Sequence, residues 1–554
     1  MTRNERKNWT FVLCDSLEKV FADERPREMD ETIPYSVFLG ETASFQVAFL
    51  PPTLDSIHTE IGGLEFAVTR GSDFTAVSSV ELVGCPLVAF DNADAGWLRT
   101  APGLYPDLLV PNGAARPIVG QWRAMWVDFN VANIADAGTH TVTVQVKSTA
   151  SGDVLFEKDV TIVVLPRELP KLDIVNTHWF HSDGLAEFYH VEVFSEAHWQ
   201  IIDNFIAKAA EADINSLLTP TWTPPLDTAV GGFRMPTQLI DISWRGDRYS
   251  FGFDKLIRWI EICTRHGIRY LEVAHLFTQW GAQSTPAIYV ERDGAVVREF
   301  GWETQATDPR YRNLLEQLLP EMMQVFRDHW DVARVIYHIS DEPRVSMLDS
   351  YTRAKAVVSD LLEGCVIVDA LSDYEFYESG AVAIPVIATD HVAPFIANQV
   401  EPFWVYYCVA QNHEVANRFI GQPSLRNRVL GWQLFAFDVD GFLQWGYNFY
   451  NNRGSTRSIN PFADTSAGGQ FLAGDSFLVY PGPDGCPYES IRFRVFATAM
   501  ADHRAMSLAA ELVGKLKVME VINPDGTLAF DHFSYDPDHY RRAREAINVL
   551  IIEA

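Results

Sequence analysis

Cysteines, basic residues and long apolar runs are scarce in this sequence, and each shortage excludes a class of protein. The six cysteines form no Cys-x-x-Cys pair, which favours buried free thiols over a disulfide framework or a zinc site. Lysine and arginine number 44 against 73 aspartates and glutamates, for a net charge of −29. This balance excludes a basic footprint for nucleic acid or an anionic membrane surface, and it disfavours a polyanionic substrate. No window approaches the ~18 uninterrupted apolar residues of a membrane-spanning helix.

The sequence also lacks a targeting signal and the usual nucleotide-binding motifs. The charged start, Met1–Trp9, is not followed by an apolar stretch, which argues against a signal peptide and predicts a cytoplasmic protein acting on an imported molecule. Neither a G-x-G-x-x-G turn nor a P-loop occurs, which disfavours a doubly wound nucleotide-binding sheet. We therefore expect no cofactor and no metal.

The sequence does have enough apolar residues for a large core. They make up 47% of the 554 residues, which suits several folded domains. Polar and apolar residues alternate over Thr141–Val146, and a second run, Val154–Val164, follows a turn-rich segment, as in a β-hairpin. Residues 1–165 are thus predicted to form an N-terminal β-sandwich, and residues 166–172, with two prolines, a linker.

From residue 173 the pattern changes to alternating strands and helices. Helices are expected at 195–213, 254–266 and 311–330. The expected strands are 174–180, 217–218, 270–277, 335–339, 366–368, 386–388, 404–407 and 442–450. This alternation predicts an α/β fold, a (β/α)8 TIM-type barrel over residues 173–510. Residues 511–554, with a helix at 540–552, are predicted to be a C-terminal helical segment packed on the barrel.

The clearest candidate for catalysis is Asp341-Glu342-Pro343, which directly follows an apolar strand. Adjacent acids cannot easily bracket a glycosidic bond, because a nucleophile and an acid must lie ~5 Å or more apart on opposite sides of it. A different division of roles fits better: Glu342 protonates the leaving oxygen, and Asp341 holds a 2-acetamido group whose carbonyl attacks C1. The like charge of Asp341 is expected to raise the pKa of Glu342.

Three alternatives stay open for this dipeptide. Asp341 could cap a helix, with Glu342 in its first turn. The substrate could lack an acetamido group, in which case Asp183, Asp369, Asp390 or Asp440 would partner Glu342, at ~5 Å in a retaining enzyme or ~7–9 Å in an inverting one. The protein could also be a non-catalytic carbohydrate-binding protein.

Other polar and aromatic residues follow the expected strands, where barrel enzymes place their active sites. Few cations occur among them, which is typical of a pocket for a neutral sugar. A single tryptophan is more often core than ligand, and His178-x-x-His181-x-Asp183 more often lines a polar barrel mouth than holds a metal. Arg234 could bind a substrate hydroxyl or pair with Asp227. The candidate substrate-binding residues are His181, Trp222, Asp227, His275, Gln279, Trp280, Trp302, His338, Tyr406, Trp445, Tyr447 and Asn448.

Several ordered motifs resemble glycoside hydrolase family 123 and the broader domain-of-unknown-function 4091 group. The strand 335–343, with its terminal Ser-Asp-Glu-Pro, is similar to the catalytic strand of that family. The other similar stretches are 218–228, 275–281, 445–450 and 474–482. The resemblance spans roughly the linker to Arg494, and the sandwich in outline.

This resemblance implies a β-sandwich followed by a (β/α)8 barrel. It also implies a β-N-acetylgalactosaminidase that retains configuration through the acetamido group, with Asp341 orienting that group and Glu342 as acid/base. We therefore expect an exo-acting, metal-independent glycosidase for β-N-acetylhexosaminides such as β-GalNAc, on a small oligosaccharide or glycoside. The sequence leaves a homo-oligomer open.

Overall fold

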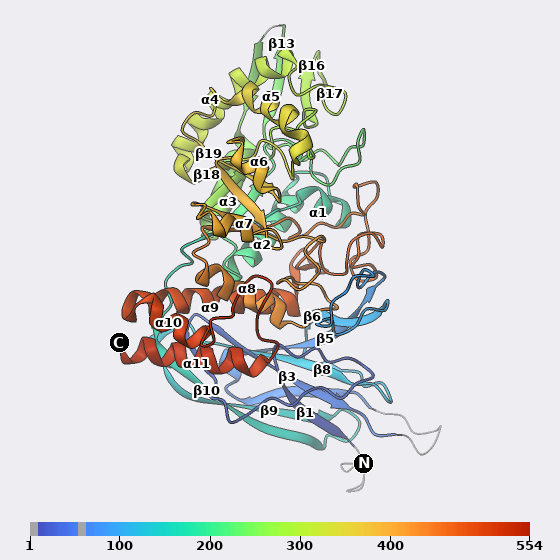
Figure 1. Cartoon of the computed structure of the whole chain (residues 1–554). Coiled ribbons are helices and arrows are strands. Elements are labelled where there is room, and N and C mark those ends of the chain that lie inside the picture. The colour runs from blue at the N-terminus through green and yellow to red at the C-terminus, as the bar shows by residue number, and fades with distance from the viewer. Residues whose placement is uncertain (1–8, 54–61, 247) are drawn as a thin grey trace. The chain divides into compact units, whose positions relative to one another are not determined.

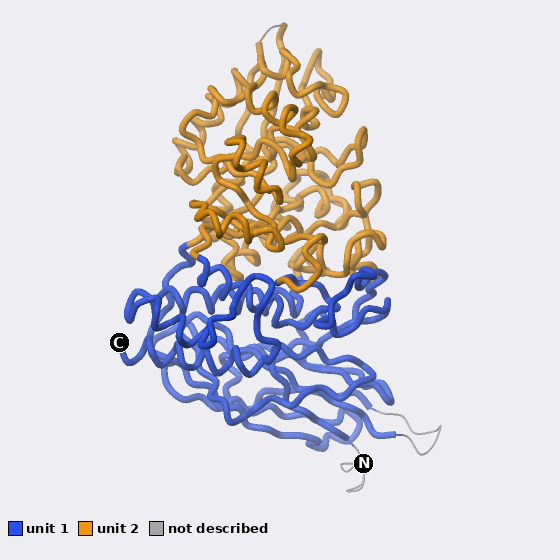
Figure 2. The backbone as a smooth tube through the Cα atoms, in the orientation of Figure 1, with its two compact units in different colours: residues 1–173, 416–437, 488–554 blue, residues 174–415, 438–487 orange. Residues whose placement is uncertain are grey.

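The structure is a computed structural model that describes residues 9–53, 62–246 and 248–554. Residues 1–8, which carry most of the argument against a signal peptide, lie outside the described residues. The chain divides into two compact units (Figure 2). Unit 1 contains residues up to 173 together with 416–437 and 488–554, and unit 2 contains 174–415 and 438–487. Across the described ranges, no helix combines the length and apolar character needed to cross a membrane.

Unit 1 contains two β-sheets. In the first, the strands run in the order β1 (Thr10–Asp15), β3 (Thr42–Leu50), β8 (Arg123–Asn130), β5 (Thr75–Cys85), β6 (Gly103–Pro111) and β24 (Pro487–Ser490). In the second, the order is β2 (Ser36–Leu39), β10 (Val154–Glu168), β9 (Gly138–Ser148), β4 (Leu64–Arg70) and β7 (Ala114–Ala115). Side chains from both sheets, such as Val127 and Ile162, share one buried apolar cluster, as expected for two packed layers.

The predicted hairpin is present as β9 and β10, which pair antiparallel. Strand β10 is longer than expected, because it continues through Pro166 to Glu168 instead of giving way to a linker at residue 166. Its parallel register with β2 shifts between Leu165 and Glu168. A proline has no N–H to donate, and a break in the ladder is one of the places where a strand accommodates it.

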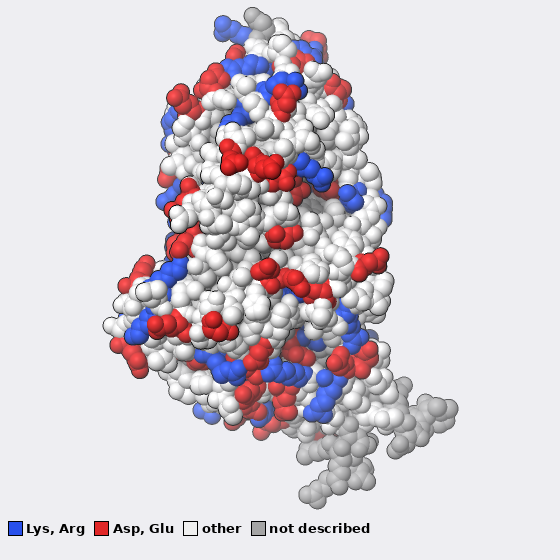
Figure 3. All heavy atoms as spheres, viewed as in Figure 1, with Lys and Arg blue, Asp and Glu red and all other residues white. Residues whose placement is uncertain are grey.

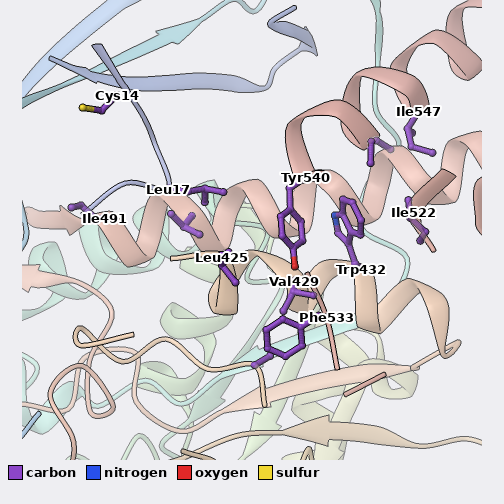
Figure 4. Packing of buried hydrophobic residues seen from close by; sticks show 14 of the residues in the cluster. Cys14, Leu17, Leu425, Val429, Trp432, Ile491, Ile522, Phe533, Tyr540 and Ile547 are labelled. Carbon is purple, nitrogen blue, oxygen red and sulfur yellow. The ribbon is translucent and has the colours of Figure 1, made fainter. Parts of the chain in front are cut away.

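The C-terminal helices belong to unit 1, which differs from the predicted boundaries. They are α8 (Leu425–Ala436), α9 (Ile491–Val513), α10 (Lys515–Ile522) and α11 (Pro537–Glu553). Figure 4 shows Tyr540 of α11 beside Trp432 of α8, whose ring centroids are 4.7 Å apart. Arg544 of α11 binds Glu41 at 2.6 Å and Asp502 at 2.8 Å. An apolar helix face predicts burial, but it does not identify the surface that covers it.

Unit 2 contains a closed barrel of eight parallel strands, so the predicted alternation is confirmed. Two neighbouring barrel strands, β18 (Val335–Tyr337) and β19 (Val366–Leu371), are labelled in Figure 1. The barrel closes through the pairing of its first and last strands, where Val175 lies opposite Gly441. In order around the barrel, the strands are β11 (Val175–His178), β12 (Ser216–Thr219), β15 (Tyr270–Val273), β18 (Val335–Tyr337), β19 (Val366–Leu371), β20 (Ile384–Ala388), β21 (Trp404–Tyr406) and β22 (Gly441–Gln444).

Helices connect most of these strands. Ser195 caps α2 (Glu196–Glu211), because its hydroxyl accepts a hydrogen bond from the backbone N–H of His198 at 3.3 Å. Ile202, Phe205 and Ile206 form the buried face of the same helix. The helices of unit 2 are α1 (Ser182–Phe188), α2 (Glu196–Glu211), α3 (Asp254–Arg265), α4 (Pro309–His329), α5 (Leu348–Val358), α6 (Tyr374–Glu378) and α7 (Ala393–Ala397).

A second, four-stranded sheet in unit 2 was not predicted. Its order is β14 (Arg248–Gly252), β13 (Asp241–Arg245), β16 (Ile288–Arg292) and β17 (Ala295–Phe300), contributed by the segments that follow β12 and β15. These strands are short and partly exposed, so their alternation of polar and apolar residues is weak.

On the face drawn in Figure 3, acidic and basic side chains are interspersed.

Candidate active site

A cavity of about 300 Å³ is formed by residues that lie at or beyond the C-terminal ends of the barrel strands. Its lining combines four carboxylic acids, several aromatic rings and two arginines. The lining residues are Trp179, Leu226, Asp227, Gln279, Trp280, Asp341, Glu342, Arg344, Ala370, Tyr406, Cys408, Val409, Leu443, Trp445, Arg453, Phe471 and Asp475.

Asp341 and Glu342 both line this cavity, although they are consecutive in the chain. Strand β18 ends at Tyr337, and the backbone carbonyl of Asp341 accepts a hydrogen bond from the N–H of Trp280 at 3.0 Å. Glu342 has φ +43°, in the left-handed region that non-glycine residues rarely adopt. In an extended strand the two side chains would point to opposite faces, and the left-handed residue breaks that alternation. Neither acid lies in a helix.

Burial sets the protonation of this pair. Burial, and then the charge of Glu342, raise the pKa of Asp341 well above its usual value. Burial also raises the pKa of Glu342, but a hydrogen bond from the Tyr406 hydroxyl to its Oε1, at 2.6 Å, and the charge of Arg344 oppose the rise. The repulsion between the acids was expected to raise the pKa of Glu342, and the pKa values of both acids are raised. The pair therefore retains a proton to higher pH than isolated carboxyls would.

A buried ionic network adjoins the pair in the barrel interior. His338 places Nε2 2.7 Å from Glu272 and Nδ1 3.5 Å from Asp369, and all three side chains are fully buried. Burial disfavours charge on His338, but the two carboxylates outweigh it and raise its pKa to about 10. The Trp179 indole also donates to Glu272, at 2.7 Å. The charge of His338 in turn lowers the pKa of Asp341.

A protein-family model described as the glycoside hydrolase 123 catalytic domain matches residues 179–509. The chain belongs to glycoside hydrolase family 123. It is therefore a glycosidase, and the resemblance seen in the sequence motifs is confirmed. No protein with a curated description matches the chain.

One solved structure agrees with this family on the fold. A family 123 glycoside hydrolase from Clostridium perfringens, solved to detail glycolipid glycan hydrolysis, is 13% identical with a TM-score of 0.73, and 98% of this chain and 99% of that chain are covered. A family 39 glycoside hydrolase from Bacteroides cellulosilyticus WH2 is 10% identical with a TM-score of 0.32, covering 80% of each chain. A Ruminococcus gnavus beta-glucuronidase is 9% identical with a TM-score of 0.32, covering 89% of this chain and 68% of that one. The last two likenesses are too weak to carry an argument.

The predicted sugar-binding residues of this family 123 chain fall into two groups. Those that line the cavity are Asp227, Gln279, Trp280, Tyr406 and Trp445. Those outside the lining are His181, Trp222, His275, Trp302, His338, Tyr447 and Asn448.

Most residues of the second group have structural partners instead. The Trp222 indole donates to the carbonyl of His275 at 2.9 Å, and Asn448 Oδ1 accepts from the N–H of His181 at 2.8 Å. The Tyr447 hydroxyl donates to the carbonyl of Phe205 at 2.8 Å. These bonds hold the loops and helices that surround the barrel strands.

Arg234 pairs with Asp183, and not with Asp227 as one prediction had it. Its guanidinium binds both oxygens of Asp183, at 2.6 and 2.8 Å, and lies 2.9 Å from Nδ1 of His181. Burial, followed by the charge of Arg234, lowers the pKa of His181 to about 3, so the ring stays neutral and can accept this bond. The charged groups of Arg234 and Asp183 thus bind each other inside the protein, which favours a structural role for this cluster.

The other acids that could have partnered Glu342 also lie outside the cavity lining. Asp369 is fully buried and accepts from the N–H groups of Ile339 and Ser340. Asp390 accepts from the side chain of Gln411 at 2.9 Å. Asp440 precedes β22, so it lies at the opposite end of the barrel from the residues that follow β18.

Ten of the cavity residues were not among the predicted site residues. Asp475 lies inside the motif 474–482 but had been given no role, and Arg344 directly follows the Asp-Glu-Pro motif. No pattern in the sequence singled out Arg453. The ten residues are Trp179, Leu226, Arg344, Ala370, Cys408, Val409, Leu443, Arg453, Phe471 and Asp475.

Proposed function

We propose that this family 123 glycosidase is an exo-acting β-N-acetylhexosaminidase, with β-GalNAc as its preferred terminal sugar, that retains configuration by acetamido participation. The observation that carries the proposal is the position of Asp341 and Glu342, which are consecutive and line the same cavity. Two carboxyls on one side of a scissile bond cannot act as a nucleophile and acid across it.

The two acids suit different steps of a substrate-assisted reaction. Glu342 donates its proton to the glycosidic oxygen while the acetamido carbonyl oxygen attacks C1, which forms a cyclic oxazolinium intermediate and releases the alcohol. Asp341 accepts the acetamido N–H and stabilises the positive charge that develops there. Glu342 then deprotonates a water molecule, whose oxygen attacks C1 from the face of the departed alcohol, so the configuration is retained.

The protonation of the site bears differently on the two roles. The raised pKa of Glu342 favours the protonated acid that the first step needs. Asp341 accepts an N–H most strongly as a carboxylate; burial and Glu342 raise its pKa and oppose that form, whereas the positive charge of His338 favours it. A bound acetamido group would favour it further, because its N–H donates to the carboxylate.

The size and lining of the cavity support exo action on a terminal sugar. A volume of about 300 Å³ lies at the lower end of the range for ligand pockets, ~300–1,000 Å³. Trp280, which is 43% exposed, and Trp445 offer aromatic surface at this cavity. Aromatic faces pack well against the C–H faces of a pyranose.

One observation favours a second candidate, a glycosidase for a sugar without an acetamido group. Asp227 and Asp475 also line the cavity and could supply the carboxylate that attacks C1. In that case Glu342 would remain the acid, and Asp341 would have no direct part in the reaction.

A panel of nitrophenyl glycosides tests these alternatives, with Asp341→Asn and Glu342→Gln beside the unmodified chain. We expect cleavage of β-GalNAc, and a loss of about 10²–10⁴-fold in kcat/KM for Glu342→Gln, the usual contribution of general acid catalysis. That loss should shrink on a dinitrophenyl glycoside, whose leaving group needs little protonation. Asp349→Asn and Glu316→Gln, exposed acids on α5 and α4, are the matched controls and should leave the rates unchanged.

Two results would contradict the proposed roles of Asp341 and Glu342. Cleavage confined to sugars without an acetamido group would overturn the role of Asp341 and favour the second candidate. Full activity of Glu342→Gln on poor leaving groups would overturn the role of Glu342.

A further inference from the structure

Two arginines lie in the cavity lining, where a neutral sugar would not require them. Arg344 follows Pro343 directly after the catalytic pair, and Arg453 lies in the long loop after β22. In the part of the chain that the structure describes, neither guanidinium pairs with a carboxylate within ion-pair distance. This is unusual in a chain with 73 acidic residues and 44 basic ones.

Arg234 shows what a structural arginine looks like in this barrel. It is 5% exposed, and its guanidinium is occupied by Asp183, His181 and the carbonyl of Leu226. Arg344 and Arg453, by contrast, are exposed residues at the cavity. Their charges act on two acids of the cavity, that of Arg344 on Glu342 and that of Arg453 on Asp227, but neither guanidinium closes an ion pair, so their N–H donors are available to a ligand.

The position of Arg344 points to the leaving-group side of the substrate. It is two residues from Glu342, which protonates the glycosidic oxygen, and its charge lowers the pKa of that acid. A group bonded beyond the glycosidic oxygen would therefore lie near this guanidinium.

Arg453 is held at the cavity by its surroundings. Its backbone N–H donates to the carbonyl of Ala467 at 3.2 Å, and its guanidinium lies 5.9 Å from the ring centroid of Phe471. Phe471 packs edge-on against Trp445 at 5.4 Å. This aromatic support positions the cation without neutralising it.

We propose that the substrate of this enzyme carries an anionic group, a carboxylate or a sulfate, on the sugar next to the terminal N-acetylhexosamine, and that Arg344 and Arg453 bind it. The inference rests on the proposed N-acetylhexosaminidase function. Arginine suits this role because its planar donors match the oxygens of both anions. The net charge of −29 disfavours a long polyanion, so a short glycan with one such group fits best.

Binding to the Glu342→Gln variant tests the proposal without requiring turnover. Three matched disaccharides would be titrated by calorimetry, with β-GalNAc linked to glucose, to glucuronate, and to glucose 6-sulfate. We expect the charged disaccharides to bind on the order of tenfold more tightly than the neutral one, as charge-assisted hydrogen bonds allow at a partly exposed site. The preferred charged ligand distinguishes carboxylate from sulfate.

The ratio of the neutral to the charged Kd is then measured in Arg344→Gln and Arg453→Gln, so that any general loss of binding cancels. Each change should reduce the ratio, while Arg344→Lys should retain part of it. Arg353→Gln, an exposed arginine on α5 that pairs with Asp349, is the control and should leave it unchanged. Equal affinity for all three ligands, or a ratio that survives both substitutions, would overturn the anion proposal alone. Failure of every N-acetylhexosaminide to bind would overturn the proposed function as well.

Discussion

Replacing Tyr406 with phenylalanine removes one hydrogen bond from Glu342 and keeps the aromatic ring. The Tyr406 hydroxyl donates to Oε1 of Glu342 at 2.6 Å, and this bond favours the ionised carboxylate. Its loss should therefore raise the pKa of Glu342 further. If Glu342 is the general acid, its protonated form is the active one, and its pKa sets the alkaline limb of the kcat/KM profile.

The size of this shift follows from the strength of the bond. A hydrogen bond to a charged group contributes ~1.5–3 kcal/mol, and the lower end applies because Glu342 is partly exposed. At 1.36 kcal/mol for each pKa unit, the alkaline limb should move up by about one pH unit. The burial of Tyr406 raises the pKa of its own hydroxyl well above the usual value, so it remains a donor throughout this range.

The assay is kcat/KM against pH for the unmodified chain and Tyr406→Phe on the same nitrophenyl β-N-acetylhexosaminide. Tyr374→Phe, which changes a tyrosine on α6 outside the cavity lining, is the matched control and should leave the profile in place. An alkaline limb that stays fixed or moves to lower pH in Tyr406→Phe would refute the assignment of Glu342 as the acid.

Three further changes test the packing that supports the site. Replacing His338 with asparagine should destabilise the fold by about 3–5 kcal/mol, because Glu272 and Asp369 lose their buried partner. The pKa of His338 is raised from 6.5 to about 10, so its contribution to stability is complete below pH 6.5 and disappears as the pH rises towards 10. Urea unfolding across this range should therefore show a loss of stability in the unmodified chain and not in the variant. Arg234→Met should cost about 3–5 kcal/mol in the same unfolding assay, because Asp183 is left buried and unpaired, and a near-neutral result would contradict that role. In Gly446→Ala, the added Cβ would lie 2.6 Å from the carbonyl oxygens of Asp475 and Ser476. We therefore expect thermal unfolding to show a loss of about 1–3 kcal/mol of stability, together with lower activity. Unchanged stability and activity would show that the loop can move.

The barrel could be predicted because its strands and helices repeat in a regular order along the sequence. That Asp341 and Glu342 reach a cavity at the end of the barrel strands could be predicted, because two acids follow an apolar strand and a proline follows them. The four-stranded sheet after β12 and β15 could not, because its strands are short and partly exposed. The place of α11 in unit 1 could not either, since it depends on long-range partners such as Glu41.

The individual site residues were predicted less well than the region that contains them. His275 and His338 follow or end barrel strands, yet they are fully buried and stack on each other with ring centroids 4.4 Å apart. A sequence shows that a residue lies near a strand end, but the local backbone decides whether it faces the cavity or the interior. Arg453 and Phe471 come from a long loop without regular periodicity, so only the folded structure brings them to the site.

The central claim is that the acetamido oxygen of the substrate, and not a carboxylate of the protein, attacks C1. Fluorine atoms on the acetamido methyl group withdraw electrons from that oxygen and weaken it as a nucleophile. The most direct measurement is therefore kcat for aryl β-N-acetylhexosaminides with zero, one, two and three such fluorines. The account predicts a steep fall in kcat with each fluorine, and a rate that hardly changes along the series would contradict it.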